Sequence, residues 1–150
     1  MSQGRAWRLQ LSGRRPPLSL NDRMHWAQRA KVTKRIRGEV AARARLLHLP
    51  TGLEHVHTQL IWLAPDARRR DEDNLVATAK PAWDGLVDYG LVPDDHPLYM
   101  TKHMPRIVSH PQRGESRLDL WVWVGPRSVT AAEAIVEGLE LGPHQGICQS

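Results

Sequence analysis

The spacing of apolar residues changes along this chain, and the changes predict the order of its elements. Residues 6–12 alternate between apolar and polar types, which predicts a first strand. The glycine, arginines and prolines of residues 13–17 interrupt regular structure. Between about residues 21 and 47, apolar side chains recur every three or four positions, which predicts a long amphipathic helix. These apolar side chains are Val32, Ile36, Val40, Ala44 and Leu47.

A second strand is predicted over residues 55–63, where apolar and polar residues alternate again. Leu60 and Trp62 share one face of this strand, which we expect to be buried. His55 and His57 share the other face, which we expect to be wet. We therefore interpret the two histidines as surface residues and not as metal ligands.

A second helix is predicted over residues 73–89, after a charged loop and before Gly90, which ends it. Pro81 lies inside this helix and should kink or interrupt it, because proline lacks the N–H that a helix interior uses. Residues 98–105 and 116–124 predict two strands that pair with each other across a polar connector.

These elements predict an α+β fold with a small mixed sheet of about four strands packed against two main helices. Residues 1–125 would form this domain, and residues 126–150 a tail with one short helix at about residues 130–140. A chain of 150 residues can bury a core without disulfides. Its single cysteine, Cys148, excludes an intrachain disulfide and a zinc site made of thiolates.

Charge is distributed unevenly along the chain, which has a net charge of +5 and a pI near 10.0. Residues 1–50 contain twelve lysines and arginines but only two acidic residues. Residues 71–95 contain seven acidic residues and one basic residue, Lys80. A basic flank beside an acidic centre is typical of a metal-dependent enzyme that acts on nucleic acid. Most of the basic residues are arginine, which suits phosphate binding but is equally explained by a GC-rich genome.

The most informative stretch is RRRDEDNL, residues 68–75, at the junction of the charged loop and the second helix. In an extended chain the carboxylates of Asp71 and Asp73 project to the same side, and Glu72 projects away. Hard oxygen ligands of this kind are what Mg²⁺ accepts. Asp94 and Asp95 follow a second turn and offer a third carboxylate. The structural alternative is that Asp73 caps the helix while Asp71 pairs with an arginine.

Lys80 follows Asp73 by two helical turns and so lies on the same face of the predicted helix. Its ammonium group would extend toward the carboxylates, because helical side chains lean toward the helix N-terminus. There it could stabilise charge that develops on a phosphate during hydrolysis. The structural alternative is an ordinary surface lysine.

Together these residues resemble the RusA-type Holliday-junction resolvases, which are endonucleases common in phages and prophages. The resemblance covers roughly residues 7–124. It depends on the order of the acidic stretch, Lys80, the Trp83–Leu86 sequence WDGL and the Asp94–Asp95 pair. Pro16, Pro17 and Asn21 resemble the Pro-Pro-Ser-x-Asn segment of the family. Lys102 and the strand RLDLWVWV resemble its closing hairpin.

The resemblance implies a homodimer that nicks opposed strands of a four-way DNA junction symmetrically, in DNA recombination and repair. It implies that Asp71, Asp73 and Asp95 bind Mg²⁺, with Mn²⁺ as a substitute, and that Lys80 completes the catalytic set. Some members of the family place this lysine one helical turn nearer to the acidic motif. The predicted DNA-binding residues are basic or amide side chains: Arg68, Arg69, Arg70, Asn74, Asn21, Arg29, Lys31, Lys34, Arg35 and Lys102.

Three alternative functions remain open from the sequence. A nuclease that prefers flaps or other branched DNA would have the same metal site, because that chemistry does not reveal DNA shape. A non-catalytic junction-binding protein would keep the basic residues but has no use for the acidic ones. A glycosyltransferase that binds metal through an Asp-x-Asp motif would not explain the basic first third of the chain.

The sequence also predicts where the protein acts. No apolar run approaches the roughly 20 residues that a membrane span needs, and the first ten residues lack the apolar stretch of a signal peptide. We therefore expect a soluble protein of the bacterial cytoplasm, with branched DNA as its partner, no membrane partner and no small-molecule cofactor.

Overall fold

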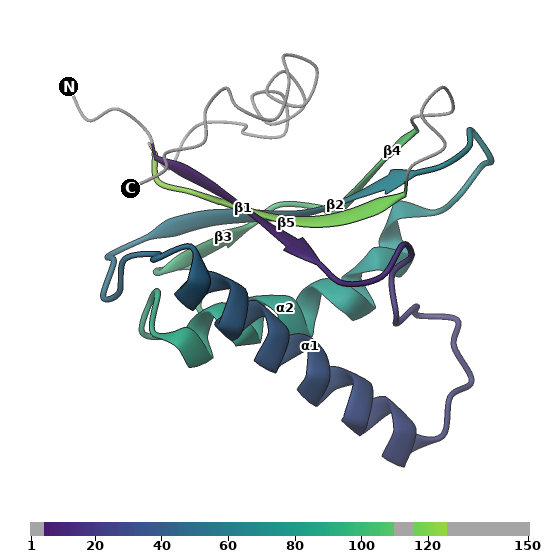
Figure 1. The fold of residues 1–150 in the computed structure, drawn as a ribbon, viewed down its shortest axis with the longest axis horizontal. Coiled ribbons are helices and arrows are strands. Elements are labelled where there is room, and N and C mark those ends of the chain that lie inside the picture. Colours follow the sequence, from purple (N-terminus) through teal and green to yellow (C-terminus); the bar gives the residue numbers. More distant parts are fainter. Residues whose placement is uncertain (1–4, 110–115, 126–150) are drawn as a thin grey trace.

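The computed structural model describes residues 5–109 and 116–125 of the chain. These residues form an α+β fold in which two helices lie against one face of a mixed five-stranded sheet (Figure 1). The predicted fold class and the two main helices are therefore confirmed, and the sheet has one strand more than expected. The predicted tail and its helix at residues 130–140 lie outside the described residues.

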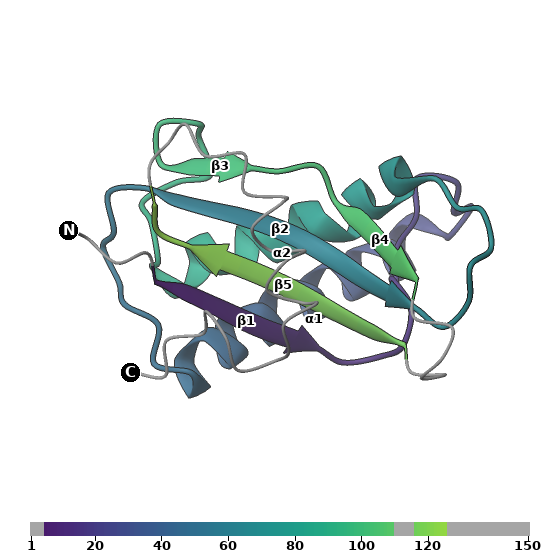
Figure 2. The same cartoon turned by 90° about the horizontal axis from the view of Figure 1, so that it is seen from above.

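The sheet is built around β2, which pairs with other strands on both of its sides (Figure 2). On one side β5 runs antiparallel to both β2 and β1. On the other side β3 pairs in parallel with the beginning of β2, and β4 pairs in parallel with its end. The strands are β1 (Ala6–Leu11), β2 (Val56–Ala64), β3 (Met100–Lys102), β4 (Arg106–Ser109) and β5 (Arg117–Trp123).

The predicted pairing of residues 98–105 with residues 116–124 is wrong. Within residues 98–105 only Met100–Lys102 form a strand, β3, and the next strand, β4, begins after Pro105, which has no N–H to donate to a strand ladder. The second segment, β5, lies on the opposite side of β2, between β2 and β1. Residues Leu118–Trp123 are all buried, as expected for a strand in the middle of a sheet rather than at its edge.

The first helix, α1 (Trp26–Leu46), begins later than the predicted residue 21. The residues before it form a turn in which the Asp22 carboxylate accepts a hydrogen bond from the Ser19 N–H at 2.7 Å. The helix then begins after His25, whose Nδ1 accepts a hydrogen bond from the Ala27 N–H. The side chains that could have extended the helix are thus used in a turn and a cap.

The second helix, α2 (Val76–Tyr89), follows a short 3₁₀ segment, η1 (Glu72–Leu75). Pro81 lies inside α2 and is buried, and the helix is not interrupted there. Gly90 ends the helix with φ of 96°, a left-handed conformation that glycine adopts without strain. The predicted end of this helix is confirmed.

The two helices approach each other closely at Gly85. A Cβ atom built on Gly85 would lie 2.7 Å from the carbonyl oxygen of Arg37 and 2.8 Å from the Cβ of Val40. Only a residue without a side chain fits at this crossing. The helices and the sheet face above them enclose the main core, which includes Leu60, Trp62 and Leu120.

The second face of the sheet is not the wet surface that we expected for the histidines of β2. His57 and Gln59 are fully buried there, beside a smaller apolar cluster that contains Trp121 and Trp123. His57 stacks on the Trp123 ring at 5.4 Å between centroids. Asp119 is buried on the same face, and burial raises the pKa of its carboxyl although Arg117 donates a hydrogen bond to it.

Neither helix in the described part of the chain combines the length and the apolar character that crossing a bilayer requires.

Candidate functional site

Two segments that are far apart in the sequence meet at one cavity of about 620 Å³. One is the stretch between β1 and α1, and the other is the junction that leads into η1. Their cavity-lining residues include Pro16, Pro17, Ser19 and Asp22 from the first segment, and Arg69, Arg70, Asp71 and Asn74 from the second. The proline segment and the acidic motif, which the sequence singled out separately, therefore face a common space.

A buried pair of hydrogen bonds holds the proline segment in place. The Leu18 N–H donates to Thr78 Oγ1 at 3.1 Å, and the Thr78 hydroxyl donates to the Leu18 carbonyl at 2.8 Å. This contact joins the segment before α1 to the first turns of α2. Thr78 was missed by the sequence analysis, because a threonine inside a helix gives no sign of a partner sixty residues away.

Asp71 and Asp73 are both exposed. Asp71 occupies the N-cap position of η1 without making a side-chain capping hydrogen bond, and the N-cap of α2 is Leu75. Within residues 5–109 and 116–125 neither carboxylate forms an ion pair. The alternative that these two residues serve as a helix cap and an arginine partner is therefore not realised. Glu72 instead accepts a hydrogen bond from the Ile107 N–H at 2.7 Å, which ties η1 to β4.

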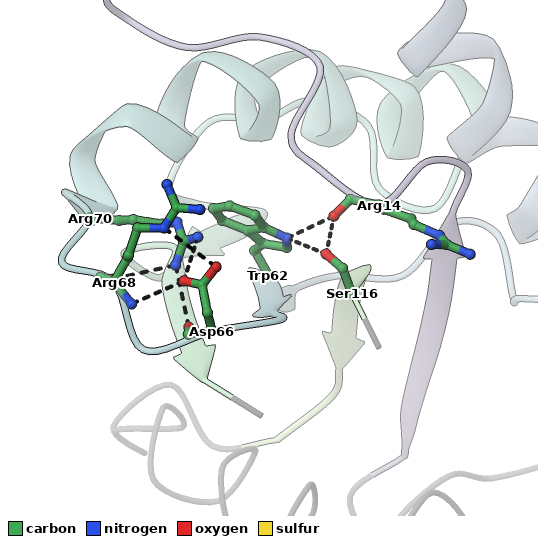
Figure 3. A network of polar contacts seen from close by, with 6 residues as sticks. All are labelled: Arg14, Trp62, Asp66, Arg68, Arg70 and Ser116. Carbon is green, nitrogen blue, oxygen red and sulfur yellow. Dashed lines mark hydrogen bonds and ion pairs between the residues drawn. The ribbon is translucent and has the colours of Figure 1, made fainter. Parts of the chain in front are cut away.

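The three consecutive arginines before Asp71 have different surroundings, and Figure 3 shows those of Arg68 and Arg70. Arg70 forms an ion pair with Asp66 at 2.8 Å and lies over the Trp62 ring, 4.8 Å from its centroid. The indole N–H of Trp62 is itself fixed by hydrogen bonds to the Arg14 carbonyl and the Ser116 hydroxyl, each 3.0 Å long. Arg70 is thus part of the local structure, although the sequence analysis placed it with the DNA-binding residues.

Asp66 also holds the backbone of this loop. The N–H of Arg68 donates to the Asp66 carboxylate, and this hydrogen bond is the main reason why the pKa of Asp66 lies below its usual value. The side chain of Arg68 extends into solvent with an 82% exposed surface and lies 3.6 Å from Asp66. Arg69 is exposed at the cavity and forms no ion pair with the rest of the described chain. Of the three arginines, Arg69 is the one most available to a ligand.

Asp95 lies between two lysines. Lys102 Nζ is 2.8 Å from Asp95 Oδ2, and Lys80 Nζ is 3.7 Å from the same oxygen. The hydrogen bond from Lys102, more than the charge of Lys80, holds the pKa of Asp95 below its usual value. Lys80 also lies 4.0 Å from Asp84. The structure therefore brings Lys80, Asp95 and Lys102 together from α2, the loop after it and β3.

The predicted metal ligands Asp71, Asp73 and Asp95 are not gathered into one cluster. Among the residues that the structure describes, no three His, Cys, Asp or Glu side chains are placed to hold a metal ion. Mg²⁺ is often bound by only one or two carboxylates, with water and substrate phosphate as its other ligands. By their donor chemistry and their freedom from ion pairs, Asp71 and Asp73 fit such an ion, whereas Asp95 is engaged by Lys102.

The remaining predicted DNA-binding residues lie on or before α1. No ion pair within the described chain involves the four predicted residues of α1: Arg29, Lys31, Lys34 and Arg35. Their neighbour Arg37 forms a bidentate ion pair with Asp88. Asn21 is exposed in the turn before the helix, where its backbone N–H donates to Ser19 Oγ. These four basic side chains of α1 are therefore free to bind an anion.

Comparisons with known proteins leave the family of this chain open. No family model matches it. The chain is 36% identical over 103 residues to an uncharacterized protein of Xylella fastidiosa, a match that covers 63% of this chain and 58% of that protein. It thus matches less than two thirds of the length of this relative. A solved structure of the periplasmic domain of Helicobacter pylori MotB covers 91% of this chain and 90% of its own, at 13% identity and a TM-score of 0.32. That similarity is too low to carry an argument.

Proposed function

We propose that this protein is a metal-dependent endonuclease of the RusA type, which resolves four-way DNA junctions by paired, symmetric cleavage. The observation that carries the proposal is that the carboxylates of Asp71 and Asp73 are accessible and not neutralised. Both carboxylates are exposed and free of ion pairs within the described chain, and Asp71 lines a cavity that Arg69 also lines. Exposed carboxylates beside cationic side chains that do not neutralise them are well suited to share a metal ion with a phosphate.

Asp71 and Asp73 would hold Mg²⁺, or Mn²⁺ in its place, together with water and a DNA phosphate. When bound, the ion would polarise the phosphodiester and lower the pKa of a water that attacks it. The attack would leave a 5′-phosphate and a 3′-hydroxyl, ends that a ligase can join. The donor set supports this role, because it consists of hard oxygen atoms.

The cluster of Lys80, Asp95 and Lys102 would stabilise the negative charge of the phosphate. Asp95 keeps its carboxylate ionised between the two lysines and holds the ammonium group of Lys102 by a hydrogen bond of 2.8 Å. Lys80 is 65% exposed and only loosely paired, at 3.7 and 4.0 Å from its acidic neighbours. It can therefore turn toward an incoming phosphate and stabilise the additional negative charge of the transition state. In this proposal Asp95 either joins the metal ligands once DNA displaces Lys102 or remains a positioning residue.

The DNA arms would lie on the free basic side chains. The phosphate backbone would be contacted by Arg69, by the amides of Asn21 and Asn74, and by four basic residues in the first half of α1: Arg29, Lys31, Lys34 and Arg35. Such contacts fix the register of the DNA without reading its sequence. A homodimer would place two such sites on one branched, densely anionic substrate. Arg70 contributes indirectly, because it stacks on Trp62 and holds the loop that presents Arg69.

The proposal is tested by incubating the full chain with an end-labelled synthetic four-way junction in Mg²⁺, in Mn²⁺ and in EDTA. Linear duplex and flap substrates of matched sequence run beside it. Paired nicks at symmetric positions on the junction alone, absent in EDTA, are the expected result. Comparable cutting of the flap would favour the second candidate, a broader structure-selective nuclease. Binding of the junction without any cutting would overturn the enzyme and leave a junction-binding protein.

Replacing Arg69 by alanine is expected to weaken junction binding and to lower the salt dependence of the binding constant by about one unit of slope, because one phosphate contact is lost. The measurement is binding to an uncleaved junction in EDTA across a range of salt concentrations. Arg45→Ala, at an exposed position near the far end of α1, is the matched control and should leave the slope nearly unchanged. A slope for Arg69→Ala equal to that of the unmodified protein would remove Arg69 from the interface.

A further inference from the structure

Trp26 differs from every other tryptophan of the chain in its exposure. All six tryptophans lie within the described residues, and five of them are at most 9% exposed. Trp26, the first residue of α1, is 76% exposed. A single exposed apolar residue is common on protein surfaces, so its exposure points to a ligand only if its surroundings do so as well.

Those surroundings form an open groove of about 710 Å³ along α1. Trp26, Ala30 and Thr33 line it together with Arg29 and Lys34. Spacings of three and four residues place these side chains on one face of the helix. The other two predicted DNA-binding residues of α1, Lys31 and Arg35, do not line it. The groove thus combines one large aromatic ring with two cations from successive turns.

The groove carries a net positive charge. Its one acidic residue, Asp88, is neutralised by Arg37 through two hydrogen bonds of 2.8 Å. Arg29 and Lys34 form no ion pair with the described residues. Two unpaired cations in the same groove as an exposed aromatic ring match a ligand that combines flat, polarisable rings with phosphates.

We propose that this surface, the Trp26 groove, binds unpaired nucleotides, with the indole of Trp26 stacked on a base and Arg29 and Lys34 on the neighbouring phosphates. An aromatic ring beside cations is how proteins bind single strands, because every base has a face on which to stack. The bases of an intact duplex are already stacked on each other and offer no such face. The proposal rests on the proposed function for its substrate, since branched DNA has unstacked bases at its branch point and in its single-stranded ends.

The groove lies where a DNA molecule at the acidic motif could also reach it. Figures 1 and 2 both show the beginning of α1 at the same end of the molecule as the junction between β2 and η1. Met24, two residues before Trp26, lines the cavity that contains Asp71. One branched substrate could therefore contact the cavity with an arm and the Trp26 groove with an unpaired base.

The test uses the full chain, a twelve-nucleotide oligothymidine and an oligomer of the same length and charge in which every base is absent. Because the other tryptophans are buried, fluorescence quenching on titration reports mainly on Trp26. We expect oligothymidine to quench the emission and to bind about ten-fold more tightly than the abasic oligomer, since stacking contributes strongly for each base. Because Trp26→Ala lacks this fluorophore, it is compared with the unmodified protein by the fluorescence anisotropy of end-labelled oligomers. The variant should lose the difference between the two oligomers and bind the abasic oligomer as the unmodified protein does.

The matched control is Leu46→Ala, which removes an equally exposed apolar side chain (71%) at the other end of α1 and should leave the preference for oligothymidine intact. Equal binding of the two oligomers by the unmodified protein would overturn the proposal. So would a Trp26 emission that is shielded from acrylamide in the free protein, because a second copy of the chain would then cover the ring.

The outcome is separable from that of the proposed function. Preference for oligothymidine without any junction cleavage would refute the nuclease and keep the groove. Junction cleavage without that preference would refute the groove and keep the nuclease.

Discussion

Replacing Asp71 by asparagine is expected to abolish cleavage of a four-way junction while binding of the junction is retained. Asparagine keeps the size of the side chain but removes the charge that a divalent ion requires. We expect the cleavage rate to fall by about a thousand-fold or more, because metal binding supplies several kcal/mol of transition-state stabilisation. The measurements are single-turnover cleavage in Mg²⁺ and a gel-shift titration of the same junction in Ca²⁺ or EDTA.

Glu54→Gln is the matched control, because it removes one negative charge from an exposed position between α1 and β2 that lines neither cavity nor groove. It should cleave at the rate of the unmodified protein. Asp73→Asn should behave like Asp71→Asn. Cleavage by Asp71→Asn at the unmodified rate would exclude Asp71 from the metal site, and loss of junction binding in the same variant would show that the substitution acts on more than the chemistry.

Replacing Gly85 by alanine is expected to cause a large loss of stability. The new Cβ would lie 2.7 Å from the Arg37 carbonyl oxygen and 2.8 Å from the Val40 Cβ. Neither atom is the end of a flexible side chain, so α1 and α2 must move apart. Overpacking of this kind costs about 3 kcal/mol, which lowers the melting temperature of a domain of this size by roughly 10 °C.

Gly38→Ala, in the neighbouring helix α1, is expected to raise the stability instead of lowering it. Gly38 is exposed in the middle of α1, and nothing lies within 4 Å of a Cβ built there. Alanine should therefore stabilise the protein by about 0.5–1 kcal/mol, because it has the higher helix propensity. Thermal unfolding of both variants followed by circular dichroism makes the comparison. A Gly85→Ala protein as stable as the Gly38→Ala protein would mean that the helices do not cross at Gly85.

Much of the local structure follows from the chain itself. The three- to four-residue spacing of Ile36, Val40 and Ala44 predicts a helix, and these residues are the buried positions of α1. Alternation predicts β1 and β2, and Gly90 ends α2 as expected. These features are readable because backbone periodicity and the conformational freedom of glycine act between near neighbours in the chain.

The predictions from sequence that were wrong have a common cause, because each depends on contacts between distant segments of the chain. Periodicity indicates that residues 117–123 form a strand but not that β5 enters between β1 and β2, because that choice depends on which apolar faces the finished sheet must cover. His57 was expected in water for the same reason, since a two-residue alternation does not say whether the second face of the sheet stays open.

The candidate site also combines features that the sequence indicates with features that only the tertiary structure shows. The composition of residues 68–75 was enough to single out the acidic motif, and the surplus of bases in the first fifty residues was enough to expect an anionic partner. Only the tertiary structure separates Arg69, which is free, from Arg70, which is stacked on Trp62 and paired with Asp66. Only the tertiary structure places Asp95 between Lys80 and Lys102 and leaves Trp26 beside free cations. The physical reason is that charge and residue type belong to each residue alone, whereas the partner that neutralises a charge or covers a ring is brought to it by the folding of the whole chain.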